Sequence, residues 1–420
     1  MRNLVRVTTI LCSALLVLSI FTLEAEFCYS QDKKNKEEAT TQTDLIDIIR
    51  DLLGKKPLKT DTTNNKDDES LKLSFLPGVA YSSNTGFLIG FNLGMAKYFG
   101  SSANTSPSAA TLSSNYTSKN QFNVKMKSDI YTSKNNWYLE GDWRLSLTSQ
   151  PTYGLGSGTP GSNEQILFYD QLRFYQKFSK KLFGNIYAGA GFYFDRFYNV
   201  KTKNLDDAEI SPNFHNEYNK KYNFDTTNYN NAGIGLLLEF DSRDNTINAY
   251  NGYYGVFKYI VNGKSLGGES YWQNAYFEFR TYQSYGKVNK HVFAFWLYGN
   301  FAVAGKAPYL SLPATGWDKY EKSGRGYSAG RFRGNGLMYG EFEYRIPLSN
   351  NGLFGAVVFI NGTTTSDPDN GTALFKYVTP GYGGGLRIKF NKNSRTNVAI
   401  DYGRGSDGAS SFSFNLGENF

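Results

Sequence analysis

The sequence has 420 residues, a formal net charge of +8, and an aromatic content of 16% supplied almost entirely by tyrosine and phenylalanine. Its only cysteines, Cys12 and Cys28, both lie in the first 30 residues, so the rest of the chain can form neither a disulfide nor a thiolate metal site. A basic charge balance suits contact with anionic lipid better than contact with nucleic acid, and no nucleic-acid partner is expected.

Residues 1–30 have the pattern of a secretory signal peptide. Two arginines precede an apolar run over residues 7–23, and small residues follow before a charged stretch begins. The pattern predicts cleavage before Gln31. Two alternatives are an uncleaved anchor, because the run approaches the length of a membrane-spanning helix, and lipidation of Cys28, which the bulky residues before it disfavour.

Residues 31–70 are polar and of low complexity, with one apolar island at 43–54. Leucine and isoleucine recur there at helical spacing, which predicts a short amphipathic helix with Thr43 or Asp44 as its N-cap and Gly54 as its stop. The helix either belongs to a simple linker or docks in the mouth of the following domain or on a periplasmic or membrane protein partner.

From residue 71 to residue 420, apolar and polar residues alternate along the chain. In "WYLEGDWRLSL" the residues on one face are Trp137, Leu139, Trp143, Leu145 and Leu147, and those on the other face are Glu140, Asp142, Arg144 and Ser146. Such alternation predicts β-strands, and charges confined to one face indicate a wet interior. An exported chain with this pattern is expected to form a transmembrane β-barrel.

Sixteen alternating segments can be counted, which predicts an all-β, 16-stranded antiparallel barrel over residues 71–420. Because the number is even, both ends of the barrel wall lie on one side of the membrane. The connections then fall into a short set, assigned to the periplasm, and a long outer set, which is the asymmetry of outer-membrane barrels. The segments are 71–82, 86–99, 107–118, 120–132, 136–148, 166–178, 182–199, 228–241, 252–262, 269–283, 289–304, 338–348, 353–362, 379–390, 395–404 and 410–420.

The last ten residues, "SFSFNLGENF", continue the alternation and end on Phe420. They resemble the C-terminal assembly signal of bacterial outer-membrane barrels. A soluble β-sandwich would also alternate, but it would not need to finish on an exposed aromatic residue. The interpretation is therefore a barrel whose last strand presents Phe420 on its outer face.

The loop 305–337, between the eleventh and twelfth predicted strands, combines many glycines with many cations in "EKSGRGYSAGRFRGNG". Its "RGY" at 325–327, "EYR" at 343–345, "FDSRDN" at 240–245 and the terminal strand occur in the order found in the BamA/TamA superfamily, the bacterial surface antigen family. In that family the arginine of the tripeptide tips a loop that folds back into the barrel. The chain is identified as a member of that superfamily, and of its POTRA-less branch, because the polar segment 31–70 is too short for a POTRA domain.

The resemblance implies a loop clamp. Glu343 lies on the lumen face of the twelfth strand, together with Tyr339, Glu341 and Arg345. Arg325 is then expected to pair with Glu343 and with an acid on the next strand, while Gly326 and its neighbours permit close backbone approach and Tyr327 completes the motif. The second acid is replaced here by Asn361, which is expected to accept a hydrogen bond from Arg325 without adding charge. The alternative is a solvated basic loop that attracts or repels lipopolysaccharide.

Two further sites are expected at the ends of the barrel. Pro77 and Gly78 in the first strand, and Gly417 and Phe420 in the last, predict a weak lateral seam, because proline lacks an N–H for the ladder and glycine permits a kink. The alternative is that Pro77 sits at a bulge facing the second strand. The "FDSRDN" stretch predicts a periplasmic turn motif formed by Asp241, Arg243, Asp244 and Asn245.

No catalytic constellation stands out in the sequence. The only histidines, His215 and His291, have no nearby serine and aspartate partners, so the chain is not expected to be an enzyme. The acidic stretch 366–372 lacks the spacing and the final glutamate of a calcium loop, so it is interpreted as a turn, and neither a metal nor a cofactor is expected.

The predicted function is a role in outer-membrane biogenesis: insertion or translocation of protein or lipid, or service as a subunit of a larger complex. The missing POTRA domains weaken the case for insertase activity. A passive pore and a structural surface antigen are the alternatives. The expected location is the bacterial outer membrane, in contact with its lipids and lipopolysaccharide.

Overall fold

The computed structural model describes residues 42–55, 70–82, 85–102, 104–203, 211–286 and 290–420. The signal peptide predicted over residues 1–30 lies outside the described residues, and so does most of the polar segment 31–70. No helix in the described part of the chain is long and apolar enough to cross a membrane.

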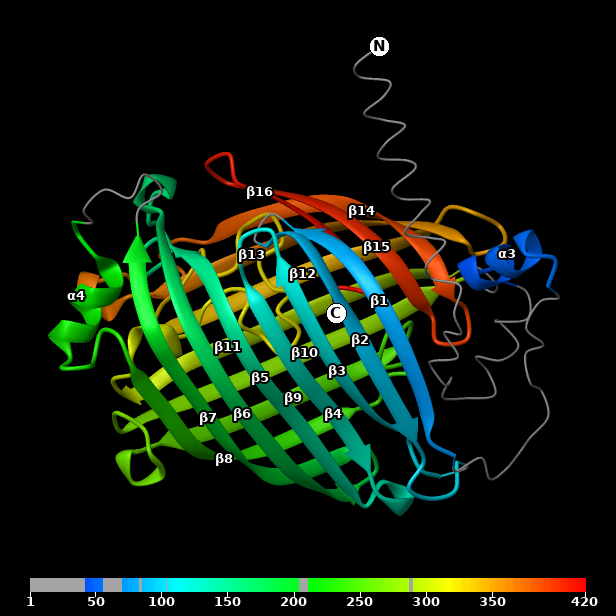
Figure 1. Ribbon diagram of the computed structural model, residues 1–420, viewed down its shortest axis with the longest axis horizontal. Helices are drawn as coiled ribbons and strands as arrows, with labels where there is room; N and C mark the ends of the chain where they lie inside the picture. The colour runs from blue at the N-terminus through cyan, green and yellow to red at the C-terminus, as the bar shows by residue number, and fades with distance from the viewer. Residues whose placement is uncertain (1–41, 56–69, 83–84, 103, 204–210, 287–289) are drawn as a thin grey trace, which may run out of the picture.

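Sixteen antiparallel strands form one closed barrel, which confirms the predicted fold class (Figure 1). Each strand pairs with its neighbours in sequence, and β1 pairs with β16. Most strand ends lie within a few residues of the predicted ones. The strands are β1 (Lys72–Ser82), β2 (Gly86–Lys97), β3 (Ser108–Thr117), β4 (Phe122–Tyr131), β5 (Trp137–Thr152), β6 (Gln165–Phe183), β7 (Ile186–Lys203), β8 (Tyr229–Asp241), β9 (Gly252–Asn262), β10 (Trp272–Tyr285), β11 (His291–Gly305), β12 (Gly336–Pro347), β13 (Phe354–Ser366), β14 (Thr379–Asn391), β15 (Thr396–Gly405) and β16 (Ser410–Leu416).

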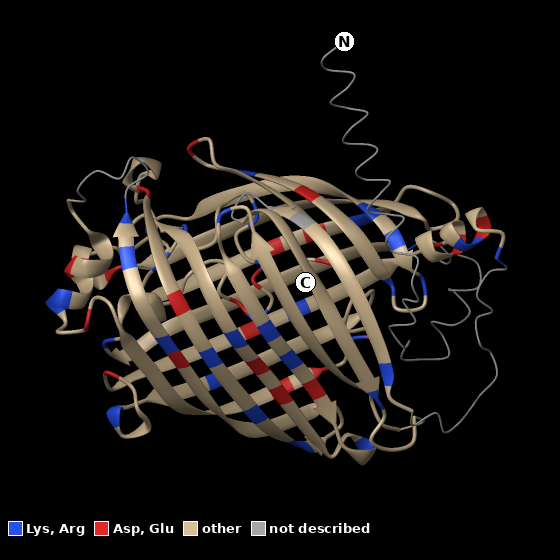
Figure 2. Cartoon of the chain, in the orientation of Figure 1, with Lys and Arg blue, Asp and Glu red and all other residues tan. Residues whose placement is uncertain are grey.

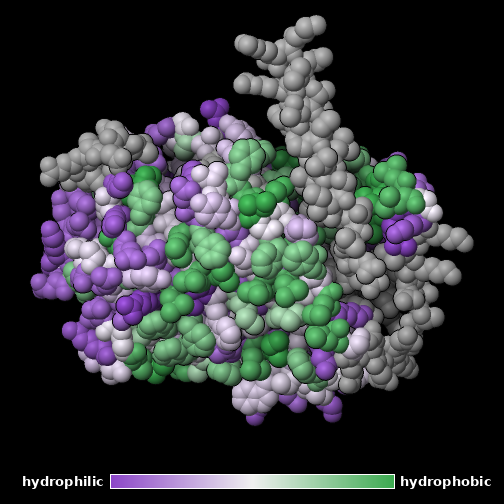
Figure 3. Space-filling model, viewed as in Figure 1, coloured by the Kyte–Doolittle hydropathy of each residue, from purple (hydrophilic) through white to green (hydrophobic). Residues whose placement is uncertain are grey.

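The outer surface of the barrel is an apolar belt. In β5, Trp143 and Leu145 point outward and are more than a third exposed, whereas Glu140 and Arg144 on the opposite face are buried. Figure 3 shows the apolar side chains as a band across the front strands, with hydrophilic residues gathered at the end that carries α4 (Phe214–Lys221). An apolar exterior with a charged interior is the arrangement that a lipid environment requires of a barrel.

Charged residues recur on neighbouring positions of adjacent strands (Figure 2). Because they alternate with the belt residues, they face the lumen, where they pair across the strands. Arg173 of β6 binds Asp195 of β7 at 2.8 Å, and Lys177 of β6 binds Glu140 of β5 at 2.7 Å. Ion pairing of this kind offsets part of the cost of holding these side chains away from bulk water.

The apolar core lies inside the barrel and on one side of it. One cluster of buried residues is centred on β9–β12 and includes Trp296 and Tyr339, and a second joins β6–β8 to α4 and to Tyr309. No residue of β1–β4 belongs to either cluster of described residues. The lumen is therefore packed against β6–β12 and more open toward the first strands.

The strand β16 is shorter than predicted, and the position expected for Phe420 is wrong. The strand ends at Leu416, and Gly417 adopts a φ of +92°, a conformation that glycine reaches without strain. The chain then turns into the lumen, where Phe420 is only 6% exposed and packs against Trp296 and Tyr282. Phe420 is therefore not an outward residue of the seam.

The amphipathic island forms the helix α3 (Leu45–Leu52), which sits at the barrel end opposite α4 (Figure 1). Asp44 is its N-cap and accepts a hydrogen bond from the backbone N–H of Asp47 at 2.8 Å. Lys392, in the turn between β14 and β15, binds the Asp47 carboxylate at 2.7 Å. Leu52 and Leu53 at the end of the helix are exposed.

Candidate functional site

The segment between β11 and β12, residues 306–335, is here called the lumen loop. Its Glu321 binds Lys125 of β4, its Trp317 indole donates to Gln150 of β5 at 3.0 Å, and further contacts described below reach β12–β16. Since these strands lie on different sides of the barrel wall, only a segment inside the lumen can contact them all. In Figure 1 this segment runs within the ring of strands.

Arg325 at the tip of the lumen loop binds three carboxylates. Its guanidinium donates to Glu341 and Glu343 of β12 and approaches the Asp401 carboxylate of β15 at 3.5 Å. It also lies over the Phe359 ring, 3.7 Å from the ring centroid. Arg325 is only 8% exposed and both glutamate side chains are fully buried, so water screens these pairs weakly.

The tripeptide Arg325–Gly326–Tyr327 packs against β15 at positions where that strand has glycine. A Cβ atom on Gly405 of β15 would come within 2.2 Å of the Tyr327 ring, and one on Gly403 within 2.7 Å of the Gly326 nitrogen. Gly326 itself has a φ of +100° and donates its N–H to the Ser411 hydroxyl at 2.8 Å. The Tyr327 hydroxyl donates to the Pro380 carbonyl at 2.5 Å. Side chains at these glycines would push the loop tip off the wall.

Asn361 is a hydrogen-bond donor to the clamp, whereas the sequence predicted that it would accept a hydrogen bond from Arg325. Its side-chain nitrogen donates a hydrogen bond to the main-chain oxygen of Arg325 at 2.9 Å, so it holds the backbone of the motif rather than its guanidinium. The carboxylates that accompany Glu343 are Glu341 and Asp401, neither of which was assigned to the clamp from the sequence. The alternation of β12 already placed Glu341 on the lumen face, but only the path of the loop brings Glu341 and Asp401 to Arg325.

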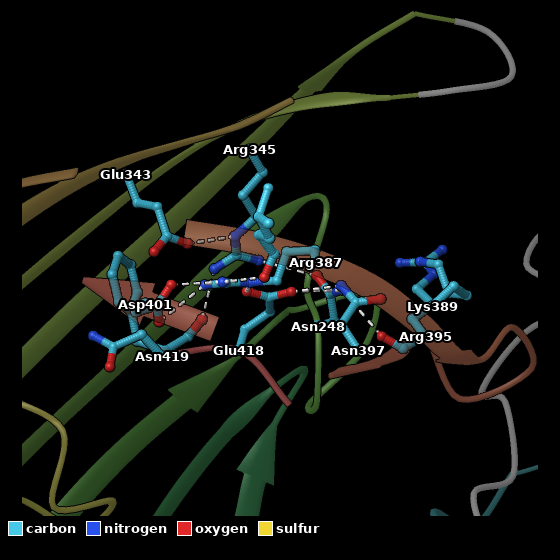
Figure 4. A network of polar contacts seen from close by, with 12 residues as sticks. Asn248, Glu343, Arg345, Arg387, Lys389, Arg395, Asn397, Asp401, Glu418 and Asn419 are labelled. Carbon is cyan, nitrogen blue, oxygen red and sulfur yellow. Dashed lines mark hydrogen bonds and ion pairs between the residues drawn. The ribbon is translucent and has the colours of Figure 1, made fainter. Parts of the chain in front are cut away.

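The clamp continues into a buried network around the last residues of the sequence (Figure 4). Arg345 binds Glu343 at 2.7 Å and donates to the main-chain oxygen of Phe420 at 2.8 Å. Arg387 of β14 binds both Asp401, at 2.6 Å, and Glu418, at 2.7 Å. Two chains of polar contacts therefore connect Arg325 to the segment that follows Gly417.

The turn motif after β8 lies against the same network. Arg243 pairs with Asp241 at 2.7 Å, Asp244 pairs with Arg395 at 2.9 Å, and the Asn245 side chain donates to the Ser394 carbonyl at 3.5 Å. Further along, Asn248 accepts a hydrogen bond from Arg345 at 3.0 Å. The connection between β8 and β9 thus extends from its own strands to the turn between β14 and β15.

A cavity of about 420 Å³ lies between the lumen loop and the first strands. Its lining comes from β1–β6, β16 and the loop, and it includes Asn115, Lys125, Ser413, Asn415 and Asn419. Next to it, β1 and β16 pair at one position among the described residues, Ser82 with Ser413, whereas β1 and β2 pair along the whole of β1, with Pro77 opposite Phe91. The cavity therefore borders the weakest junction in the barrel wall.

The fold is that of BamA-type barrels. The chain superposes on BamA from Haemophilus ducreyi lacking POTRA domains 1–3 with a TM-score of 0.53 and 14% identity, covering 92% of this chain and 81% of that one. CdiB from Acinetobacter baumannii gives 0.50 and 14%, covering 83% of this chain and 66% of that one. CdiB from Escherichia coli gives 0.50 and 11%, covering 84% and 68%. The predicted likeness to this superfamily is confirmed at the level of the fold.

No protein-family model matches the sequence, and no curated protein matches it. In the described part of the chain, no group of three or more histidine, cysteine or acidic residues is arranged to hold a metal ion. His215 is buried beside Tyr229, whose hydroxyl lies 3.1 Å from its ring nitrogen, and His291 bonds to the Tyr344 hydroxyl at 2.7 Å.

Proposed function

We propose that this protein is an outer-membrane barrel of the BamA/TamA superfamily that assists the insertion or translocation of polypeptides or lipids, without acting as an enzyme. The observation that carries the proposal is that the described residues of β1 and β16 pair at one position, beside a polar cavity. A wall held by few hydrogen bonds is the easiest place for a barrel to open, because each backbone hydrogen bond broken in lipid costs several kcal/mol and few need to be broken here.

Three of the residues that the sequence assigns to the seam, Pro77, Gly78 and Gly417, lie in or directly after the two strands that meet there. Pro77 has no N–H to donate, Gly78 lies beside it, and Gly417 ends the pairing region of β16. Continuing the register from Ser82 and Ser413 by five residues places Pro77 opposite Glu418, so a longer β16 would meet a position without a donor. Both strands therefore limit the length of the seam.

Locking the seam tests the proposal. The only cysteines of the sequence lie in the predicted signal peptide, so a Ser82→Cys/Ser413→Cys pair can be oxidised selectively. We expect the locked barrel to remain folded and to lose its ability to complement a deletion strain, with recovery on reduction. The matched control is Ser74→Cys/Gly94→Cys, which links β1 to β2, where pairing is already continuous. Full activity of the locked seam would contradict the proposal.

The passive pore is the second candidate, and the lumen loop opposes it. Glu321, Arg325 and Tyr327 tie the loop to strands around the barrel, so the loop occupies the channel. Single-channel recordings separate the two candidates: steady, large openings support a pore, and small, irregular openings support an occupied lumen. An absence of both conductance and an assembly defect would favour a structural surface antigen.

The helix α3 is proposed as a docking point for a periplasmic or membrane protein partner. Its N-terminal end is fixed to the barrel through Asp44, Asp47 and Lys392, whereas Leu52 and Leu53 are exposed. Pull-down from outer membranes with and without residues 43–54 tests this role. Recovery of the same proteins in both cases would exclude it.

A further inference from the structure

We propose that the lumen contains a peptide-binding socket whose ligand is a short extended segment with a carboxylate and, two residues later, an aromatic side chain. In this structure the occupant is the chain's own segment 418–420. The inference deepens the proposed function and rests on it only for the idea that another polypeptide can take the same place. The socket itself is defined by contacts of the described residues.

The first position of the socket receives the carboxylate of Glu418. Arg387 donates to one oxygen at 2.7 Å and Asn397 donates to the other at 2.6 Å, while Lys322 of the lumen loop reaches the Glu418 main-chain oxygen at 3.2 Å. The side chain of Glu418 is only 1% exposed. Charge-assisted contacts to a buried carboxylate select strongly for an acidic residue at this position.

The second and third positions receive Asn419 and Phe420. The Asn419 side chain donates to Glu341 at 3.2 Å, and the Phe420 ring packs 5.4 Å from Trp296 and 6.2 Å from Tyr282 between ring centroids. Arg345 holds the Phe420 main-chain oxygen at 2.8 Å. The aromatic pocket belongs to the core cluster on β9–β12, so the occupant leads from the end of β16 to side chains of β10 and β11.

Among the charged groups that contact the occupant or the clamp, the cations outnumber the fixed carboxylates by one. The cations are Arg325, Arg345, Arg387 and Lys322, and the fixed carboxylates are Glu341, Glu343 and Asp401. Four cations against three carboxylates leave one positive charge, and Glu418 supplies the fourth carboxylate. An empty socket therefore retains a buried excess cation, which favours binding of a carboxylate.

The occupant is joined to the barrel in a way that permits exchange. The strand β16 ends at Leu416, and the joint is Gly417, where an added Cβ would meet nothing within 4 Å. Withdrawal of residues 418–420 breaks no strand pairing of the described barrel. The cavity of about 420 Å³ is lined by Asn415 and Asn419, so it lies directly beside the occupant and offers a path to the socket.

The test uses a fluorescein-labelled hexapeptide with the sequence of residues 415–420 and two chains with an empty socket, refolded in detergent. One chain ends at Leu416, and the other carries Glu418→Ala/Phe420→Ala in the full sequence. We expect saturable binding to both and at least about tenfold weaker binding to the wild type, whose own segment competes. Peptides with glutamine for the glutamate or alanine for the phenylalanine should each bind about tenfold more weakly.

Equal binding to the wild type and the emptied chains, or equal binding of all three peptides, would overturn the proposal. Failure of both emptied chains to fold would overturn it too, because a segment that the fold requires is not an exchangeable ligand. An amidated form of the peptide shows whether a free carboxylate at the last residue contributes. Since the assay measures binding by purified protein, it can succeed while the seam-locking experiment fails, and the reverse also holds.

Discussion

The two sides of the barrel are built differently. On the packed side, β6–β12, strands pair at many positions, including fourteen between β10 and β11, and both apolar clusters lie against the wall. On the hollow side, formed by β16 and β1–β4, a cavity replaces the clusters, and the described residues of the closing pair share one bridge. The lumen loop therefore packs closely against one side of the barrel and reaches the other side through separate polar contacts, which leaves free space beside the seam.

The anchors of the lumen loop are also of two kinds. Arg333 lies in the packed side with no exposed surface and donates to the carbonyls of Tyr309, Leu310 and Leu312 at 3.0–3.4 Å. Arg325 instead binds carboxylates of β12 and β15. The first arginine shapes the loop itself, whereas the second attaches it to the wall. Substitutions at the wall should therefore release the loop without unfolding the barrel.

The largest effect is expected for Arg325→Met. The change leaves Glu341, Glu343 and Asp401 without their shared cation, and breaking a buried ion pair from one side costs about 3–5 kcal/mol. We expect the lumen loop to become sensitive to protease and the channel openings to become larger. The matched control is Arg173→Met, which breaks a buried pair with Asp195 on the wall without touching the loop. Equal protease sensitivity in both variants would contradict the clamp.

A smaller effect is expected for Gly405→Ala. The new Cβ would lie 2.2 Å from the Tyr327 ring, so the loop tip must shift, at a cost of about 1–3 kcal/mol. The control is Gly340→Ala on β12, where the nearest atom to the added Cβ is 3.9 Å away. Limited proteolysis of the loop and heat-modified gel migration compare the two. Equal protease sensitivity of the loop in Gly405→Ala and Gly340→Ala would contradict a close contact between Gly405 and Tyr327.

The sequence predicts the strands well because alternation is a local signal. Each face repeats every second residue, and the turn residues between segments mark the ends, so no long-range information is needed. The same alternation predicts which face of a strand points inward, and it assigns Glu341 and Glu343 to the lumen. What the pattern leaves open is the path of the loop and the stagger between strands, which bring these two carboxylates and Asp401 to one arginine.

The last four residues show where local reasoning stops. Phe420 keeps the parity of Phe412 and Leu416, so periodicity alone assigns it to the outer face. The turn at Gly417 depends on partners far away in sequence, Arg345 and Arg387 among them. These contacts exist only in the assembled lumen, and no sequence pattern within the last strand predicts them.

The next effect, on the order of 1 kcal/mol, is expected for Asn361→Asp. The sequence alone suggests that a carboxylate here tightens the clamp, but the structure reverses the expectation. The side-chain nitrogen of Asn361 donates to the Arg325 carbonyl at 2.9 Å, and an aspartate would place an oxygen against that carbonyl. We expect the loop to loosen. Asn274→Asp on β10 is the control, because it removes donors to Asn300 and Phe301 away from the loop. Lower protease sensitivity of the loop in Asn361→Asp would instead support the interpretation from the sequence, that a carboxylate at this position strengthens the clamp.

The smallest effect concerns the outer end of the packed side, where His215 of α4 is fully buried. Burial lowers the pKa of His215 from 6.5 to about 4 in the folded protein. Its neighbours are polar but uncharged at the contact, with Asn216, Asn219 and Tyr229 bonding the ring, while the nearby Arg333 cation also opposes protonation. The folded cluster therefore holds a neutral imidazole, whereas the unfolded segment takes up a proton near pH 6.5.

Because the unfolded form binds more protons between pH 6.5 and pH 4, the stability of this cluster should be unchanged above that window and fall as the pH drops through it. We expect amide exchange in α4 to rise at pH 5 relative to pH 7, while exchange in β10 and β11 stays constant. His215→Gln cannot titrate and should remove the difference. An equal rise in the variant would assign the pH dependence to another group, such as the contact between Tyr222 and Asp369 that ties α4 to the loop between β13 and β14.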